Sequence, residues 1–174
     1  MRLKTDPDQY RAFEGIKLKV KPGPHEMRWY TYNKPVSGDA EICVTIQLPH
    51  IVTDPTGTGA GVLFGGDDAG DFDFFFLWAN GNASMLRYSK QSDKLDVPIT
   101  PFKASRLDPS PGAKNRVRVR VQDGTATLFV NNQQFAAYRG SLPSGAGKVG
   151  IIVQSESTRS DSWKFANFRA TGLQ

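Results

Sequence analysis

The chain has 174 residues, of which 39% are hydrophobic and 22% charged, and a formal net charge of +5. This length suits a single domain with a buried core and argues against a disordered chain. The 17 glycines and 11 prolines, spread along the chain, exclude a helix bundle or coiled coil, and no apolar run approaches the ~20 residues of a membrane span. One cysteine and two histidines exclude an internal disulfide and disfavour a His/Cys zinc site.

Alternation of apolar and polar residues, bounded by turn residues, predicts β-strands along the whole chain. The strands are predicted at residues 16–21, 40–48, 72–79, 82–90, 116–122, 125–130, 133–138, 148–154 and 163–170. Long polar connections are predicted at residues 50–59 and 98–114. About ten to twelve short strands predict an all-β protein, a two-sheet antiparallel β-sandwich with little or no helix.

The dipeptide Asn80-Gly81 lies between two of these strands, and Asn-Gly is typical of a two-residue hairpin turn. With such a turn, Asp73 lies opposite Tyr88. Alternation then places Phe75 on the same face of the hairpin, while the other face carries the residues expected in the core. We therefore predict that a carboxylate, a phenyl ring and a phenol point together toward solvent.

A second hairpin is predicted around Asp123-Gly124, with Arg118 opposite Phe129 on its outer side. A further turn at Asn131-Asn132 leads to Tyr138, which we place on the same face. Guanidinium groups beside aromatic rings can hold an anionic sugar or stack on a nucleobase. The ordinary alternative is a solvated face whose like charges discourage aggregation.

An acidic loop at residues 65–73 contains Asp67, Asp68 and Asp71. Several carboxylates close in sequence suit Ca²⁺, which prefers oxygen ligands, but Asp-Gly clusters also form ordinary turns. We therefore expect no cofactor, with calcium at this loop as the alternative.

The order of the sequence segments resembles the concanavalin A-like lectin/glucanase superfamily, with its bacterial laminin G-like and 3-keto-disaccharide hydrolase-like branches as the closest. The resemblance covers about residues 13 to 171. The segments that carry it are GDAE at 38–41, GAGVLF at 59–64, DFDFFF at 71–76, LRY at 86–88, NRVRV at 115–119, LFVNN at 128–132, GKVGI at 147–151 and WKFANF at 163–168. It implies one jelly-roll domain over residues 1–174, of a kind that is often exported and often associated with glycans.

The same resemblance allows a test for catalysis. Retaining glucanases of this superfamily carry their acids on one strand as E-x-D-x-x-E, because alternate strand residues share a face. The nearest match is Asp71-x-Asp73, with Phe76 where the acid/base residue would lie. The glucanase motif is therefore absent. Asp71 and Asp73 stay as an alternative catalytic pair for a hydrolase acting on a 3-keto-disaccharide.

We predict a non-catalytic domain that binds a carbohydrate through a partly aromatic sheet face. The predicted ligand-binding residues are Asp73, Phe75, Tyr88, Arg118, Phe129 and Tyr138. Most other aromatic residues, including Trp29 and Trp163, are expected to fill the sandwich. A structural or adhesion module without a small-molecule site is a further alternative. We expect no nucleic-acid partner, and the oligomeric state stays open.

The N-terminal residues include basic side chains but no apolar segment behind them, so no signal peptide is expected in this chain. The family resemblance nevertheless favours a periplasmic or extracellular location.

Overall fold

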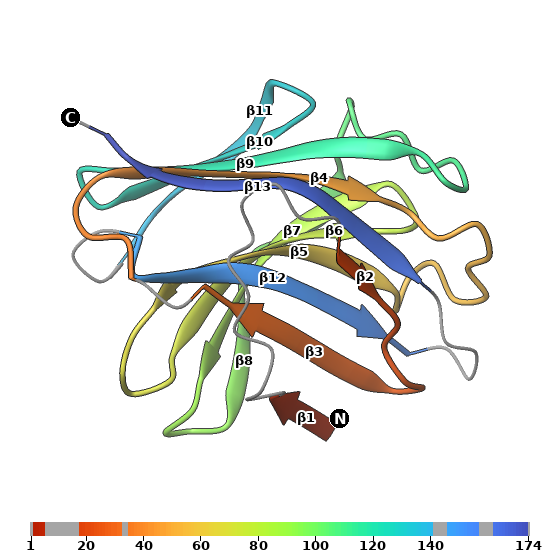
Figure 1. Ribbon diagram of the computed structural model, residues 1–174, viewed down its shortest axis with the longest axis horizontal. Helices are drawn as coiled ribbons and strands as arrows, with labels where there is room; N and C mark the ends of the chain where they lie inside the picture. Colours follow the sequence, from red (N-terminus) through yellow and green to blue (C-terminus); the bar gives the residue numbers. More distant parts are fainter. Residues whose placement is uncertain (1, 6–17, 33–34, 141–145, 157–161, 174) are drawn as a thin grey trace.

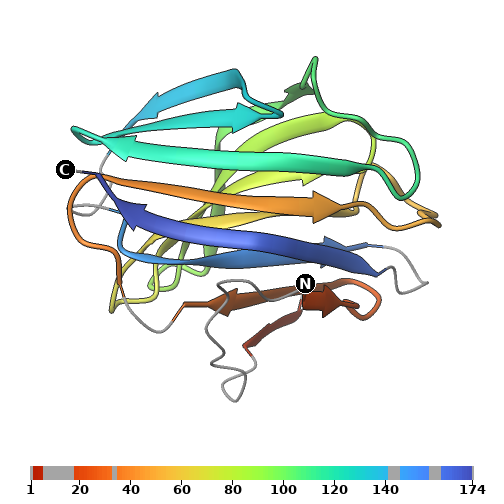
Figure 2. The same cartoon turned by 45° about the horizontal axis from the view of Figure 1, so that its top comes forward.

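The computed structural model describes residues 2–5, 18–32, 35–140, 146–156 and 162–173, and its strands form two sheets packed face to face (Figures 1 and 2). The seven-stranded sheet has the order β1 (Arg2–Thr5), β3 (Glu26–Thr31), β12 (Lys148–Ser155), β5 (Gly59–Gly66), β6 (Phe72–Trp78), β7 (Asn82–Ser89) and β8 (Lys94–Lys103). The six-stranded sheet has the order β11 (Gln133–Arg139), β10 (Thr125–Val130), β9 (Lys114–Gln122), β4 (Ala40–Gln47), β13 (Trp163–Gly172) and β2 (Leu18–Val20).

This architecture confirms the predicted all-β sandwich. Neighbouring strands are antiparallel except β1 and β3, which pair in parallel. β2 lies within the strand predicted at residues 16–21, and Ile16 and Lys17 fall outside the described residues. Within the described ranges, no helix has the length and apolar character needed to cross a membrane.

The main hydrophobic core lies between the two sheets and is built from alternate residues of each strand. In β4, for example, Ala40, Ile42, Val44 and Ile46 are buried, while the residues between them are half-buried on the outer face. Trp163 of β13 is completely buried in this core, as expected for a residue that fills the sandwich. The period-two pattern of the sequence thus reports directly on which face packs against the other sheet.

The prediction of a connection at residues 98–114 is wrong in its first part, because β8 continues to Lys103. The strand contains Pro98 and Pro101, which lack the N–H group that an interior strand needs. β8 tolerates them because it is an edge strand that pairs only with β7. Most of its residues are exposed on both faces, so its sequence lacks the alternation on which the strand predictions depend.

The hairpin of β9 and β10 has the predicted register. Arg118 pairs with Phe129, and Val119 pairs with Leu128. Asp123 and Gly124 both have positive φ angles, 49° and 70°, as a two-residue type I′ turn requires. Here the turn dipeptide and the alternating apolar residues of the two strands together predicted the pairing.

The hairpin of β6 and β7 differs from the prediction by one residue. Asp73 pairs with Arg87 and Phe72 with Tyr88, whereas the predicted partner of Asp73 was Tyr88. Of the two turn residues, Gly81 has a positive φ of 90° and Asn80 does not, and the Gly81 N–H donates to the Trp78 carbonyl. The connection is therefore a longer loop rather than a type I′ turn, and a shift of one residue moves each side chain of β7 to the opposite face.

Candidate functional site

The predicted solvent-exposed group of Asp73, Phe75 and Tyr88 does not exist in the structure. Phe75 is completely buried between the sheets, where its ring lies 5.6 Å from that of Phe135, and the Asp73 side chain is 2% exposed. Tyr88 lies on the opposite face of the sheet, half-buried. The prediction that these three residues share an exposed face is wrong for two reasons. The face of β6 that carries Asp73 and Phe75 packs against the other sheet, and the one-residue register shift places Tyr88 on the opposite face.

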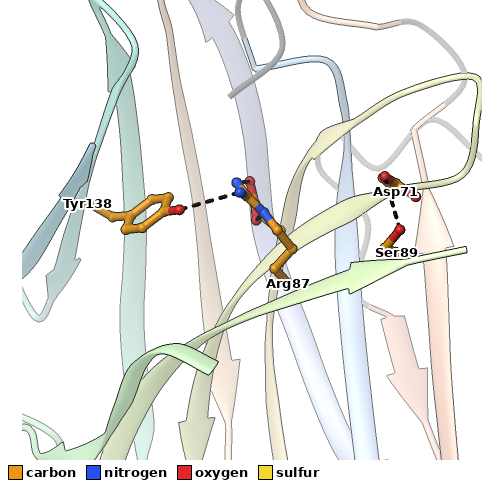
Figure 3. A network of polar contacts seen from close by, with 5 residues as sticks. Asp71, Arg87, Ser89 and Tyr138 are labelled. Atoms are coloured by element: carbon orange, nitrogen blue, oxygen red, sulfur yellow. Dashed lines mark hydrogen bonds and ion pairs between the residues drawn. The ribbon is translucent and has the colours of Figure 1, made fainter. Parts of the chain in front are cut away.

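Asp73 instead forms a buried ion pair that connects the two sheets. Arg87 donates from Nε to Asp73 Oδ1 at 2.8 Å and from Nη2 to Oδ2 at 2.9 Å. Its Nη1 donates to the hydroxyl of Tyr138, on β11 of the other sheet, at 3.3 Å (Figure 3). Burial raises the pKa of Asp73 against the lowering effect of Arg87, and the Asp73 hydrogen bond raises the pKa of Arg87. This group has the features of a structural bridge.

Tyr138 was predicted on the outer face with Arg118 and Phe129, and this prediction is also wrong. Asn131 and Asn132 form the expected turn, both with positive φ. The register between β10 and β11 then shifts between Phe129 and Leu128, so that Tyr138 pairs with Ala126. This β-bulge turns Tyr138 toward the interior, where it meets Arg87.

Arg118 and Phe129 do lie together on the outer face of the six-stranded sheet. The guanidinium carbon of Arg118 is 3.9 Å from the centre of the Phe129 ring, a cation–π contact. Arg118 and Arg120 also lie 3.2 Å from the Glu41 carboxylate. The ring is therefore covered by Arg118, and both arginines have an internal counter-charge.

The acidic loop uses its carboxylates for local structure. Asp67 Oδ1 accepts hydrogen bonds from the N–H groups of Gly70 and Asp71, and Asp68 forms an exposed ion pair with Lys148 at 2.9 Å. Asp71 accepts from the N–H of Lys90 at 2.8 Å and from the Ser89 hydroxyl (Figure 3). Within the described ranges, no group of three or more His, Cys, Asp or Glu side chains is placed to hold a metal ion.

The alternative catalytic pair of Asp71 and Asp73 receives no support from this placement. The carboxylate of Asp73 is buried and engaged by Arg87 through both oxygens, while Asp71 is held by the backbone of Lys90. A general acid or nucleophile has to reach the glycosidic bond, and Asp73 has no access to solvent.

The outer face of the seven-stranded sheet carries a second hydrophobic core. Six of its residues are buried although they point away from the main core: Met27, Leu63, Phe74, Phe76, Leu86 and Ile152. Four half-buried aromatic residues pack against them, and we call these the aromatic cluster: Trp29, Phe72, Trp78 and Tyr88. A sheet face turned toward solvent is ordinarily polar, so an apolar face of this size is a candidate binding surface.

The aromatic cluster reaches across several strands. Trp29 lies on β3 and Tyr88 on β7, with three strands between them, which corresponds to about 19 Å across a flat sheet. Their ring centres are nevertheless only 6.4 Å apart, and Trp29 is 6.2 Å from Phe72. The side chains therefore lean toward one another over the strands between them and cover the second core.

Polar contacts fix the orientation of two of these rings. The indole Nε1 of Trp78 donates to the Ser84 hydroxyl at 2.8 Å, and the Trp78 ring lies 4.8 Å from that of Phe76. Tyr88 donates its hydroxyl proton to Asp93 at 3.1 Å. Burial and the neighbouring Asp93 raise the pKa of Tyr88, so the phenol stays protonated at neutral pH.

Sequence reasoning identified some of these residues but misplaced them. The face of the hairpin that was expected in the core carries Phe72, Phe74, Phe76 and Trp78, and it lies on the outer side of the sheet instead. Trp29 was expected to fill the sandwich, and it instead lies on the outer face with Tyr88. The available signal was that both faces of β6 are apolar, which indicates a strand buried on both sides.

Comparison with known structures shows which fold this is. The carbohydrate-binding module CBM66 from Bacillus subtilis aligns over 98% of this chain and 100% of its own, with a TM-score of 0.70 and 13% sequence identity. Sheep galectin-11 in complex with glycerol aligns over 86% and 98% of the two chains (TM-score 0.56, 13% identity). A β-glucanase from Bacillus licheniformis aligns over 92% and 79% (TM-score 0.64, 8% identity).

These neighbours are consistent with a concanavalin A-like fold, and at such low identity they show the fold alone. The finer resemblance to laminin G-like and 3-keto-disaccharide hydrolase-like domains is not confirmed by them. A comparison of the sequence with protein-family models finds no matching model, and one with curated proteins finds no significant match.

Proposed function

We propose that this protein binds a carbohydrate through the aromatic cluster on the outer face of its seven-stranded sheet. The observation that carries the proposal is a group of half-buried rings on a sheet face that points away from the main core. Binding sites commonly combine apolar walls with a few placed polar groups, and here the exposed Asp93 supplies a carboxylate beside Tyr88.

The chemistry of the cluster suits a sugar ring. Pyranose rings present C–H faces that pack against aromatic planes, while their hydroxyl groups need donors and acceptors at the edge. The rings of Trp29, Phe72 and Tyr88 are held by mutual contacts, so little side-chain entropy is lost when a ligand binds. The Tyr88 hydroxyl donates to Asp93, which leaves its lone pairs able to accept from a sugar hydroxyl.

The comparisons support this choice among the functions that the fold permits. Two of the similar structures are named as a carbohydrate-binding module and a galectin. Of the two carboxylates in the catalytic alternative, Asp73 is buried and paired with Arg87. A location outside the cytosol belongs to the same proposal, since the domains that the sequence resembles are often exported.

A glycan array followed by calorimetry on the best neutral oligosaccharide tests the proposal. Replacement Trp78→Ala or Trp29→Ala removes a stacking surface, and we expect affinity to fall about tenfold for each. Phe102→Ala is the matched control, because Phe102 is 45% exposed on edge strand β8 and does not belong to the cluster.

Two results contradict the proposal. One is an array on which no saccharide binds the folded protein. The other is a bound saccharide whose affinity is the same in the wild type, Trp78→Ala and Trp29→Ala. A thermal denaturation curve for each variant shows whether it is folded at the temperature of the titration.

A further inference from the structure

The outer face of the six-stranded sheet is strongly basic. In β2, β13, β4 and β9, alternate residues point away from the core, and strand pairing aligns them in rows. Glu41 is the one carboxylate at these outward positions. The outward cations are Lys19, Lys114, Arg116, Arg118, Arg120, Lys164 and Arg169.

One row concentrates lysines. Lys19 pairs with Lys164, Lys164 with Gln47, and Gln47 with Lys114, on four successive strands. Lys19 and Lys164 lie directly opposite one another, and like charges in this position destabilise a sheet, so this pair does not serve folding. A lysine on an edge strand prevents pairing with the edge of another sheet, but this explains only Lys19 on edge strand β2. Lys164 and Lys114 lie on interior strands.

The three lysines surround a pocket, which we call the lysine pocket. Its volume is about 370 Å³, at the lower end of the range for small-molecule sites. The short side chains of Thr45 and Ala166 contribute to its lining, together with Asn167, which has a positive φ of 57°. β13 is irregular between Ala166 and Arg169, which interrupts the even surface of the sheet at this point.

The ammonium groups of this pocket have no internal counter-charge among the described side chains. Arg118 and Arg120 are paired with Glu41, but no carboxylate within the described ranges forms an ion pair with Lys19, Lys114 or Lys164. Three cations around one concave site, without an ion-paired carboxylate among the described residues, attract an anionic group and hold it through charge-assisted hydrogen bonds.

We propose that the lysine pocket binds the carboxylate or sulfate group of an acidic saccharide. Thr45, Gln47 and Asn167 supply neutral donors and acceptors for sugar hydroxyl groups beside the charge. Single-stranded nucleic acid is commonly held by stacking of its bases on exposed aromatic rings, and Phe165, the one aromatic residue among the described residues that line the pocket, is buried. The lysine pocket lies on the opposite sheet from the aromatic cluster, so an experiment can contradict one of the two proposed sites without contradicting the other.

Calorimetry of the full chain against four probes tests the proposal: a sulfated tetrasaccharide, tetragalacturonate, sodium sulfate and a short oligothymidylate. We expect one of the two acidic saccharides to bind most tightly, with affinity that falls as salt is raised. Lys164→Gln and Lys114→Gln should each weaken it about tenfold, the effect of losing one charge-assisted hydrogen bond. Lys103→Gln, on β8 of the other sheet, is the matched control and should leave it unchanged.

Thr45→Glu separates a binding role from a structural one. Thr45 pairs with Arg116, so a glutamate there adds an opposite-charge pair to the sheet while it places a carboxylate beside the pocket. We expect the thermal midpoint to be maintained or raised and the saccharide affinity to be lost.

The proposal is overturned if neither acidic saccharide binds, or if sulfate or oligothymidylate binds as tightly as the better saccharide. It is equally overturned if Lys164→Gln, Lys114→Gln and Thr45→Glu all keep the wild-type affinity.

Discussion

Asp73 illustrates how burial decides the role of a residue. On an exposed face, its carboxylate would be a sugar ligand or a catalytic group. Between the sheets it is the partner of Arg87, and through Arg87 it connects β6 and β7 to Tyr138 on the other sheet. Removal of only one partner of this ion pair should destabilise the fold, because a buried charge without a counter-charge is unfavourable.

The two halves of this pair are not equivalent, and we predict that their removal has unequal effects. Arg87→Met leaves the buried Asp73 carboxylate without a cation and should lower the free energy of unfolding by about 3 kcal/mol at neutral pH. Asp73→Asn should cost less, because the Arg87 side chain is 24% exposed and can reach water. Urea denaturation of both variants measures the difference, and equal losses would contradict this account.

The deficit of Arg87→Met should also depend on pH. Burial already raises the pKa of Asp73, and the loss of Arg87 removes the effect that lowers it. At pH values between the pKa of Asp73 in the unfolded state and its higher pKa in the native state, the native state of the variant binds more protons than the unfolded state. The free energy of unfolding of the variant therefore falls as pH rises through the native pKa of Asp73. The deficit relative to wild type should therefore be largest at neutral pH and shrink toward about pH 4, near the unfolded pKa of a carboxyl. A deficit that grows toward acidic pH would show that Asp73 is not the group responsible.

At the level of strands, glycines make room for the rings that cover the sheet. A Cβ at Gly59 on β5 would collide with the ring of Phe76, and one at Gly66 would meet the ring of Phe72. The rings therefore lie over bare backbone on the neighbouring strand. Without side chains at Gly59 and Gly66, Phe76 and Phe72 can pack directly against β5 on the outer face of the sheet.

Gly59→Ala should consequently disturb both stability and binding. We expect a loss of about 1–3 kcal/mol, typical of inserting a methyl group into a packed core, and a weaker affinity for the proposed saccharide as Phe76 and Trp78 shift. Gly172→Ala is the control, because a Cβ there has open space beyond one atom at 3.9 Å. Thermal denaturation that gives the same midpoint for both variants would contradict the proposed packing.

The two hairpins show how far sequence patterns define pairing. Asp123-Gly124 gives the predicted register because β9 and β10 each have one apolar face, so only one register buries it. Asn80-Gly81 does not, because both faces of β6 are buried and the pattern favours neither register. The fold class, most strands and the Arg118–Phe129 contact were therefore predictable. The positions of Tyr88 and Tyr138 depended on single-residue register shifts, and the burial of Asp73 and Phe75 depended on which of the two apolar faces of β6 packs against the other sheet.

At the level of the whole molecule, the sandwich presents two outer faces of opposite chemistry. The seven-stranded sheet displays the aromatic cluster, which suits the C–H face of a sugar. The six-stranded sheet displays cations that greatly outnumber carboxylates, although the whole chain has a net charge of only +5. The shared core between the sheets holds these two surfaces back to back, so ligands of different kinds would not compete for the same face (Figures 1 and 2).

The most direct test of the proposed function is a nuclear magnetic resonance titration that follows the three indole N–H signals. Trp29 and Trp78 belong to the aromatic cluster, while Trp163 is completely buried between the sheets and serves as an internal control. On addition of the best neutral oligosaccharide from the array, the signals of Trp29 and Trp78 should shift in proportion to occupancy and that of Trp163 should stay in place. Saturable binding that leaves both Trp29 and Trp78 unshifted would place the saccharide elsewhere and contradict the account.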